Sequence, residues 1–151
     1  MIYTPLTTKA MKLAYKAHQG QYDQSGVPYI FHPVHLAEQM DDEITTCIAL
    51  LHDVLEDTSL TIEDLRQEFP EIVVETVFLL THDPAVDYLD YVRKLCTSPL
   101  ARKVKLADIT HNTDETRLSG TATSPEQLAH WRKKYTQAKE IIQVYENGGK
   151  A

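Results

Sequence analysis

The chain has 151 residues, 42% of them hydrophobic and 25% charged, so we expect one folded domain over residues 1–151 rather than a disordered chain. The net charge of −7 argues against broad electrostatic binding to nucleic acid, which needs clustered lysine and arginine. The sequence lacks the ~20 consecutive apolar residues that cross a bilayer and the apolar core of a signal peptide, so we expect a cytoplasmic protein that does not bind a membrane.

Helical periodicity, capping residues and prolines recur along the chain, whereas no alternating run is long enough for a strand. The pattern therefore predicts an all-α bundle of about eight helices with a loop over 20–29. The predicted helices cover residues 8–19 (after a Thr7 or Thr8 cap), 33–40, 42–56, 61–69, 71–81, 88–96, 98 to at least 112, and 124–147. We expect Thr61, Ser98 and Ser124 to cap the helices that begin at these residues. We expect residues 146–151 to form a flexible tail.

The predicted helix over 42–56 is apolar around most of its circumference, which is typical of a central, buried helix. His52 and Asp53 interrupt this pattern, directly before Val54 and Leu55. Burying an ionised carboxylate is costly unless it is paired, hydrogen-bonded or bound to a metal. The pair therefore indicates a polar site inside the bundle, and one metal ion can take the imidazole nitrogen and the carboxylate oxygen together.

Two more donors occur in apolar surroundings elsewhere in the chain. His32 lies between a predicted loop and a helix, and Asp108 lies inside the helix over 98–112. With His52 and Asp53 they give two nitrogen and two oxygen donors. This mixed set suits one divalent ion such as Mn²⁺, Fe²⁺, Co²⁺ or Zn²⁺ better than Ca²⁺.

Further polar groups follow one helical turn after these donors. Glu56 and Asp57 come four residues after His52 and Asp53, and Asn112 comes four after Asp108. Residues at this spacing share a helix face. Glu56 and Asp57 are therefore our candidate catalytic acids, and Asn112 is a candidate substrate ligand.

Each of these residues alone has a structural explanation. A single histidine on an apolar helix is usually a satisfied core residue, and Asp108 could simply pair with Lys105. Glu56 and Asp57 could form the solvated end of a helix. The combination of two histidines, two acids and a second polar layer favours a hydrolytic site instead.

At these residues the sequence resembles the HD superfamily of metal-dependent phosphohydrolases, and in particular the hydrolase domain of RelA/SpoT proteins and small stand-alone alarmone hydrolases. The resemblance extends over residues 7–145. The segments that carry it are AHQGQ at 17–21, SGVPYIFHP at 25–33, ALLHDVLEDT at 49–58 and VKLAD at 104–108 with Asn112.

The resemblance implies removal of the 3'-pyrophosphate from guanosine tetraphosphate, a small nucleotide, with one Mn²⁺ as cofactor. It implies Glu56 and Asp57 as the catalytic pair and Asn112 as a substrate contact. The metal ligands that it implies are His32, His52, Asp53 and Asp108. Ser25 and Arg117 are further candidates for substrate binding, although the pattern around Arg117 favours a solvated helix residue.

One departure from the family concerns the substrate. The family usually has a basic Arg-Lys pair just before the Ser-Gly, where this chain has Asp23 and Gln24. A second hypothesis therefore keeps the metal and changes the substrate to another nucleotide or a phosphorylated cofactor. A third hypothesis is a nucleotide-binding module without catalysis.

Overall fold

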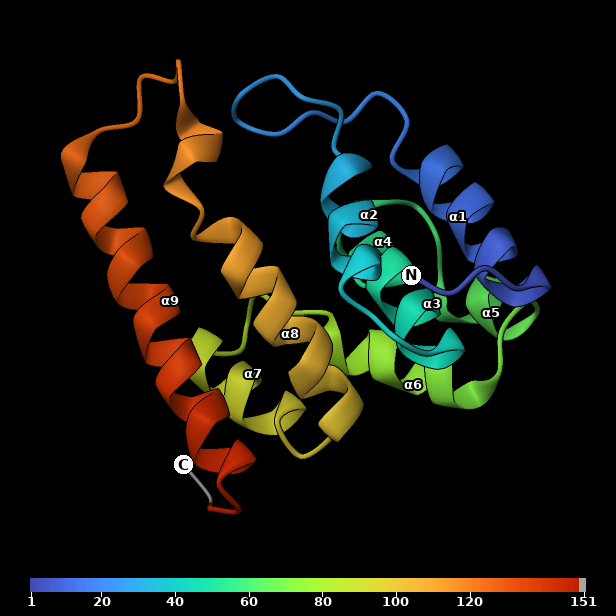
Figure 1. Ribbon diagram of the computed structural model, residues 1–151. Helices are drawn as coiled ribbons and strands as arrows, with labels where there is room; N and C mark the ends of the chain where they lie inside the picture. Colours follow the sequence, from blue (N-terminus) through green and yellow to red (C-terminus); the bar gives the residue numbers. More distant parts are fainter. Residues whose placement is uncertain (150–151) are drawn as a thin grey trace.

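The computed structural model describes residues 1–149, and over this range the protein is all-helical, as the sequence predicts (Figure 1). An isolated bridge between Tyr22 and Pro28 is the sole strand-like pairing within these residues. The helices are α1 (Pro5–Ala17), α2 (Phe31–Glu38), α3 (Glu43–Leu51), α4 (Val54–Asp57), α5 (Ile62–Arg66), α6 (Glu71–Leu80), α7 (Tyr88–Leu95), α8 (Pro99–Asn112), the 3₁₀ helix η1 (Glu115–Leu118) and α9 (Pro125–Glu146).

Polar caps set the helix starts. The caps expected at Thr61, Ser98 and Ser124 are confirmed, because each side chain accepts a backbone N–H three residues on. The cap expected at Thr7 or Thr8 is wrong. Thr4 caps α1 and forms a reciprocal box with Thr7, which leaves Thr7 inside the first turn.

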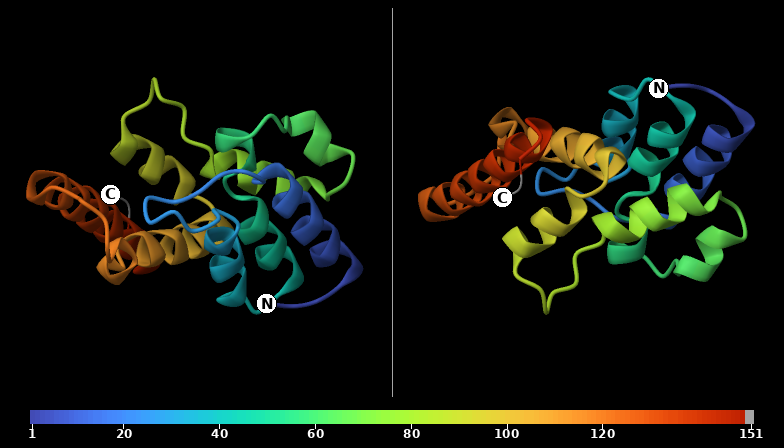
Figure 2. Two further views of the ribbon diagram at one scale, coloured as in Figure 1. Left: turned by 90° about the horizontal axis from the view of Figure 1, so that it is seen from above. Right: turned by 90° about the horizontal axis from the view of Figure 1, so that it is seen from below.

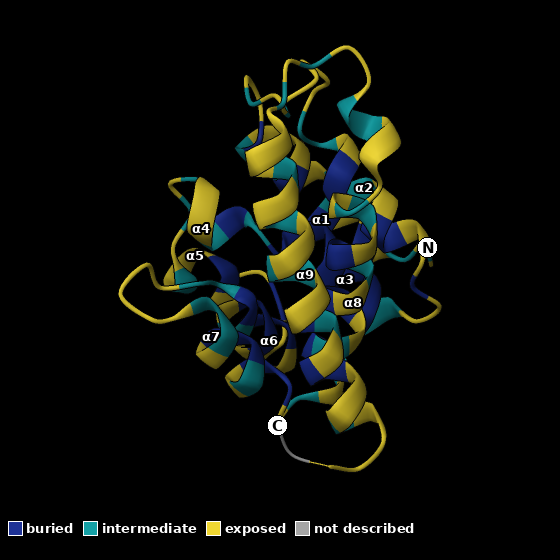
Figure 3. Ribbon diagram, turned by 90° about the vertical axis from the view of Figure 1, so that its left-hand side faces the viewer, coloured by how far each residue is buried: buried dark blue, intermediate teal, exposed yellow. Residues whose placement is uncertain are grey.

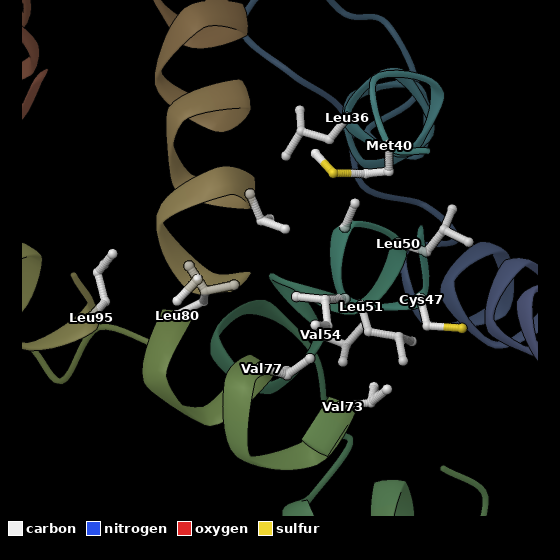
Figure 4. Close-up of a cluster of buried hydrophobic side chains, with 14 of the residues drawn as sticks. Leu36, Met40, Cys47, Leu50, Leu51, Val54, Val73, Val77, Leu80 and Leu95 are labelled. Atoms are coloured by element: carbon white, nitrogen blue, oxygen red, sulfur yellow. The ribbon is translucent and has the colours of Figure 1, made fainter. Parts of the chain in front are cut away.

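Helix α3 is the centre of the bundle, as its apolar circumference predicts. Every residue from Thr45 to Leu51 is buried, and α3 packs against α1, α2, α6 and α8. Figure 4 shows Leu50 and Leu51 among side chains from α2 and α6, including Leu36 and Val77. Each such leucine contributes about 1.5–3 kcal/mol through removal from water.

The expected continuous helix over 42–56 is wrong at the two residues that matter most. Helix α3 ends at Leu51, His52 and Asp53 form a turn, and α4 resumes for a single turn from Val54. The break coincides with a hydrogen bond from His52 Nδ1 to the carbonyl oxygen of Ala49, at 2.7 Å. In a regular helix that carbonyl accepts the backbone N–H of Asp53.

Helices α8 and α9 form a second layer beside the α1–α6 bundle (Figure 2). Helix α9 packs against α7 and α8 through Ala138, Ile141 and Ile142, while most of its outer face is exposed (Figure 3). None of the helices within residues 1–149 has the length and hydropathy needed to span a bilayer.

Residues 146–149, part of the expected flexible tail, instead have defined contacts at the end of α9. Glu146 is the last residue of α9 and pairs with Arg102, with Nε and Oε1 3.3 Å apart. Asn147 caps the helix, and Gly148 takes the positive φ of 80° that commonly ends one. Residues 150–151 of that expected tail lie outside the described residues.

Candidate metal centre and substrate cleft

Three parts of the fold bring the four predicted metal ligands together. His32 lies in the first turn of α2, His52 and Asp53 form the α3–α4 turn, and Asp108 lies in α8. The Nε2 atom of His32 is 3.0 Å from Asp108 Oδ1, and His52 Nε2 is 2.9 Å from Asp53 Oδ2. His52 Nε2 is also 3.8 Å from Asp108 Oδ1. Three helical segments therefore converge on one point.

The hydrogen bond of His52 to Ala49 determines which ring nitrogen of His52 carries a proton and which one faces the site. A carbonyl can only accept, so Nδ1 carries a proton and Nε2 of the neutral ring presents a lone pair toward the two carboxylates. Nε2 is buried and has no partner with hydrogen-bond geometry. Burial would lower the pKa of His52, but the carboxylates of Asp53 and Asp108 outweigh it and raise the pKa to about 9. The surroundings of Nε2 thus favour a bound cation.

Asp108 is buried with both oxygens engaged. Oδ1 faces His32 and accepts from Asn112 Nδ2 at 2.9 Å, while Oδ2 accepts from Lys105 Nζ at 2.9 Å. Burial alone would raise the pKa of Asp108, but the charges of Lys105 and the two histidines hold it well below its usual range. Asp108 is therefore an anion at the centre of the site.

A second cluster of carboxylates lies next to the four predicted ligands. Ligand oxygens of Asp53, Glu56 and Asp57 lie within 4.8 Å of one another. Partial burial and the neighbouring Asp53 and Glu56 charges raise the pKa of Asp57 to about 6. Glu56 is held by the backbone N–H of His82, which donates to its Oε1 at 2.7 Å. The predicted catalytic pair is thus adjacent to the ligand set.

The donor set fits a divalent metal. One ligand atom each from His32, His52 and Asp53 lies within 4.8 Å of the others, and Asp108 is 3.0 Å from His32. Two imidazoles with two carboxylates suit a borderline transition ion, and a buried, unpartnered imidazole nitrogen is what such a site presents.

Sequence reasoning missed two residues that contact the ligands. The hydroxyl of Tyr29 donates to Oδ2 of Asp53. The Nδ1 atom of His111 is 2.7 Å from His32 Nδ1, and its ring stacks on His35 with centroids 4.0 Å apart. His111 comes 79 residues after His32 in the chain, so helical spacing gave no signal for it. Tyr29 belongs to the segment SGVPYIFHP at 25–33, but the sequence alone does not show that it contacts Asp53.

Besides a pocket of about 340 Å³ whose lining includes His32 and His111, two pockets open beside the ligand set. The first, which we call the tryptophan pocket, has a volume of about 270 Å³ and is lined by residues that include Tyr22, Trp131, Arg117 and Asn112. The second, the acidic pocket, has a volume of about 190 Å³. Tyr29, Asn112 and Tyr135 line both.

The three predicted substrate-binding residues all line the tryptophan pocket: Ser25, Asn112 and Arg117. The hydroxyl of Ser25 donates to the carbonyl oxygen of Arg117. Arg117 also donates to the carbonyl of His111 at 3.0 Å, which joins η1 to the end of α8. These contacts tie the loop over 20–29 to η1 across 92 residues of sequence.

Asp23, which also lines the tryptophan pocket, holds the loop over 20–29 in shape. Its Oδ1 accepts the backbone N–H groups of Ser25 and Val27 at 2.8 and 3.0 Å. Its Oδ2 lies 3.5 Å from Nη2 of Arg117. The Asp23 carboxylate therefore shapes the loop, and the guanidinium of Arg117 offsets its charge.

The acidic pocket holds two lysines: Lys105, which the sequence offered as a possible partner of Asp108, and Lys134, which the sequence gave no reason to select. Lys105 is buried and paired with Asp108. Lys134 of α9 lies over the ring of Tyr88, with Nζ 4.3 Å from the ring centroid. Asp53, Glu56 and Asp57 line the same pocket.

The chain is similar to known proteins over about two thirds of its length. A GTP pyrophosphokinase of Streptomyces coelicolor is 37% identical over 117 residues, covering 69% of this chain and 14% of that protein. The bifunctional (p)ppGpp synthase/hydrolase SpoT of Escherichia coli is 38% identical over 121 residues, covering 69% of this chain and 17% of that protein. The chain thus spans less than a fifth of the length of these relatives.

The fold has a similar counterpart among solved structures. A structure described as a metazoan ortholog of SpoT that hydrolyses ppGpp superposes with a TM-score of 0.81 at 22% identity, covering 95% of this chain and 88% of that one. The family model of the HD domain matches residues 10–145. The chain therefore belongs to the HD domain family.

Proposed function

We propose that this protein is a phosphohydrolase that uses one divalent metal ion, Mn²⁺, and removes the 3'-pyrophosphate from guanosine 3',5'-bis(diphosphate). The observation that carries the proposal is the convergence of His32, His52, Asp53 and Asp108 beside a pair of acids and two pockets. The similarity to relatives named as hydrolases of this nucleotide supports the choice of substrate.

When bound, the metal would polarise the phosphoryl oxygens and the attacking water. The chain's own residues supply the rest. Asp57, with its pKa near 6, can accept the proton of that water as the bond between the ribose 3'-oxygen and phosphorus breaks, and can return this proton to the departing 3'-oxygen. Glu56, fixed by the His82 amide, orients the water. Lys105 keeps Asp108 ionised, so that Asp108 remains a ligand.

The tryptophan pocket would hold the nucleoside. Trp131 and Tyr22 offer aromatic faces for a base, and Asn112 can donate to a sugar or phosphate oxygen. Arg117 lines this pocket as a cation whose charge is shared with Asp23, 3.5 Å away. In the acidic pocket, the departing phosphate would lie near Lys105 and Lys134.

A hydrolysis screen with added Mn²⁺ and product identification tests the proposal. We expect GDP and pyrophosphate from guanosine 3',5'-bis(diphosphate), and no turnover in Asp53→Ala with retained folding. Absence of turnover on every nucleotide, together with absence of metal binding, would overturn the proposal and favour a module that only binds nucleotides.

A second candidate keeps the metal and changes the nucleotide. It is motivated by Asp23, whose charge Arg117 offsets, so that the pocket lacks the net positive charge of a basic pair. Rates on nucleoside monophosphates and phosphorylated dinucleotide cofactors, compared with the alarmone under the same conditions, decide between the two. A large preference for the alarmone excludes this candidate.

A further inference from the structure

One cation of the acidic pocket makes no ion pair or hydrogen bond with any residue from 1 to 149, although carboxylates outnumber lysines there. Four carboxylates line the pocket, those of Asp53, Glu56, Asp57 and Asp108, so it repels an anion unless positive charge is supplied locally. A metal ion would neutralise only the groups that it contacts. For any phosphoryl group that lies further from the metal, the lysines of the pocket must supply the neutralising positive charge.

The two lysines of the pocket are not equivalent. Lys105 Nζ donates to Asp108 Oδ2 at 2.9 Å, so its charge is committed to that carboxylate. Lys134 has no hydrogen-bond or ion-pair partner within residues 1–149. Its Nζ lies over two ring faces, 4.3 Å from the centroid of Tyr88 and 5.3 Å from that of Tyr135.

The surroundings of Lys134 are those of a group arranged for an anion. Its side chain is partly buried, and desolvation together with the charge of Lys105 lowers its pKa. Ring faces attract an ammonium weakly and leave its N–H groups available. A phosphoryl oxygen could therefore bind Lys134 without displacing a protein partner, and would gain a charge-assisted hydrogen bond.

We propose that Lys134 binds the distal phosphoryl group of the 3'-diphosphate that is transferred to water, and so makes the enzyme prefer a diphosphate over a monophosphate at the scissile position. This inference rests on the proposed phosphohydrolase function. The scissile phosphoryl group would lie at the four ligands, none of which Lys134 contacts. Because Lys134 lines the same pocket, it would meet the next phosphoryl group along.

Lys134→Met tests the proposal against Lys133→Met, an exposed neighbour on the same helix. The two variants lose the same charge, and only one of them loses it inside the pocket. For each, kcat/KM is measured with guanosine 3',5'-bis(diphosphate) and with guanosine 5'-diphosphate 3'-monophosphate. We expect Lys134→Met to lower kcat/KM about tenfold or more for the bis(diphosphate) and not for the 3'-monophosphate. Lys134→Arg should retain most of the wild-type kcat/KM for the bis(diphosphate).

A binding measurement distinguishes a failure of this inference from a failure of the proposed function. Affinities of the Mn²⁺-loaded protein for pyrophosphate and for orthophosphate are measured by calorimetry, without turnover. We expect Lys134→Met to weaken pyrophosphate binding selectively. Equal losses for both anions, or none for either, would overturn the inference even if the wild type is active. A wild type that turns over no nucleotide but shows the selective loss would overturn the proposed function and leave the anion site standing.

Discussion

Tyr29 illustrates, at the scale of single residues, how the site orients its ligands. Its hydroxyl donates to the Asp53 oxygen that lies 2.9 Å from His52 Nε2. Groups that hydrogen-bond to a metal ligand commonly change affinity 10–100-fold when removed. We therefore expect Tyr29→Phe to weaken Mn²⁺ binding by about tenfold, measured by titration calorimetry. Tyr22→Phe, at an exposed tyrosine, is the control and should leave the affinity unchanged.

His111 supports His32 in a comparable way. If Nε2 of His32 binds the metal, its Nδ1 carries the proton, and His111 Nδ1 at 2.7 Å accepts it. Burial, followed by the charge of Arg117, lowers the pKa of His111 to about 4, so its ring stays neutral and able to accept.

Replacing His111 by Phe should therefore weaken Mn²⁺ binding by about tenfold, whereas Asn, which keeps an acceptor, should recover part of the loss. Electron paramagnetic resonance of free Mn²⁺ measures both. His130→Phe, at an exposed position, serves as the control. Equal affinities for the Phe variant and the wild type would show that His111 does not position the ligand.

A substitution at Asp57 should affect catalysis and leave metal binding nearly unchanged. Asp57 is exposed and lies within 4.8 Å of Asp53 and Glu56, on the side of the acidic pocket. Asp57→Asn keeps the shape and removes the proton acceptor, so kcat should fall by about 100-fold or more while Mn²⁺ affinity changes little. Steady-state kinetics with a parallel metal titration check this. A variant that turns over at the wild-type rate would remove Asp57 from the catalytic role.

At the scale of the helices, much of the framework could be predicted from local signals. The caps at Thr61, Ser98 and Ser124 and the buried α3 follow from residues close together in sequence. The break after Leu51 could not be predicted, because it coincides with a side-chain bond from His52 to Ala49 inside an otherwise apolar helical pattern. Propensity alone favours continuation there.

The ligands also connect the helices. They come from α2, the α3–α4 turn and α8, so a bound metal would link three segments of the fold. Mn²⁺ at about 100 times its dissociation constant should add about 2.7 kcal/mol to the free energy of unfolding. For a chain of this size that corresponds to a rise in Tm of about 5–10 °C. Differential scanning calorimetry with and without chelator measures it, and Asp53→Ala should show no such shift.

At the scale of the whole molecule, the sequence identified the four converging donors but not the cleft around them. The donors could be named because each is a polar residue in an apolar pattern. The walls of the cleft could not be predicted, since they depend on contacts such as Ser25 with Arg117, 92 residues apart. Lys134 gave no signal at all, because lysine on an exposed helix is ordinary until the fold places it beside Tyr88.

The two pockets meet at Tyr29, Asn112 and Tyr135 but otherwise have different linings. The nucleoside product and the phosphate product would therefore occupy separate sets of residues once the bond between them is broken. Neither product needs the other to leave first, which predicts a random order of release. With both products present as inhibitors, their effects on the initial rate should multiply, whereas mutually exclusive inhibition would mean that the two pockets act as a single binding site.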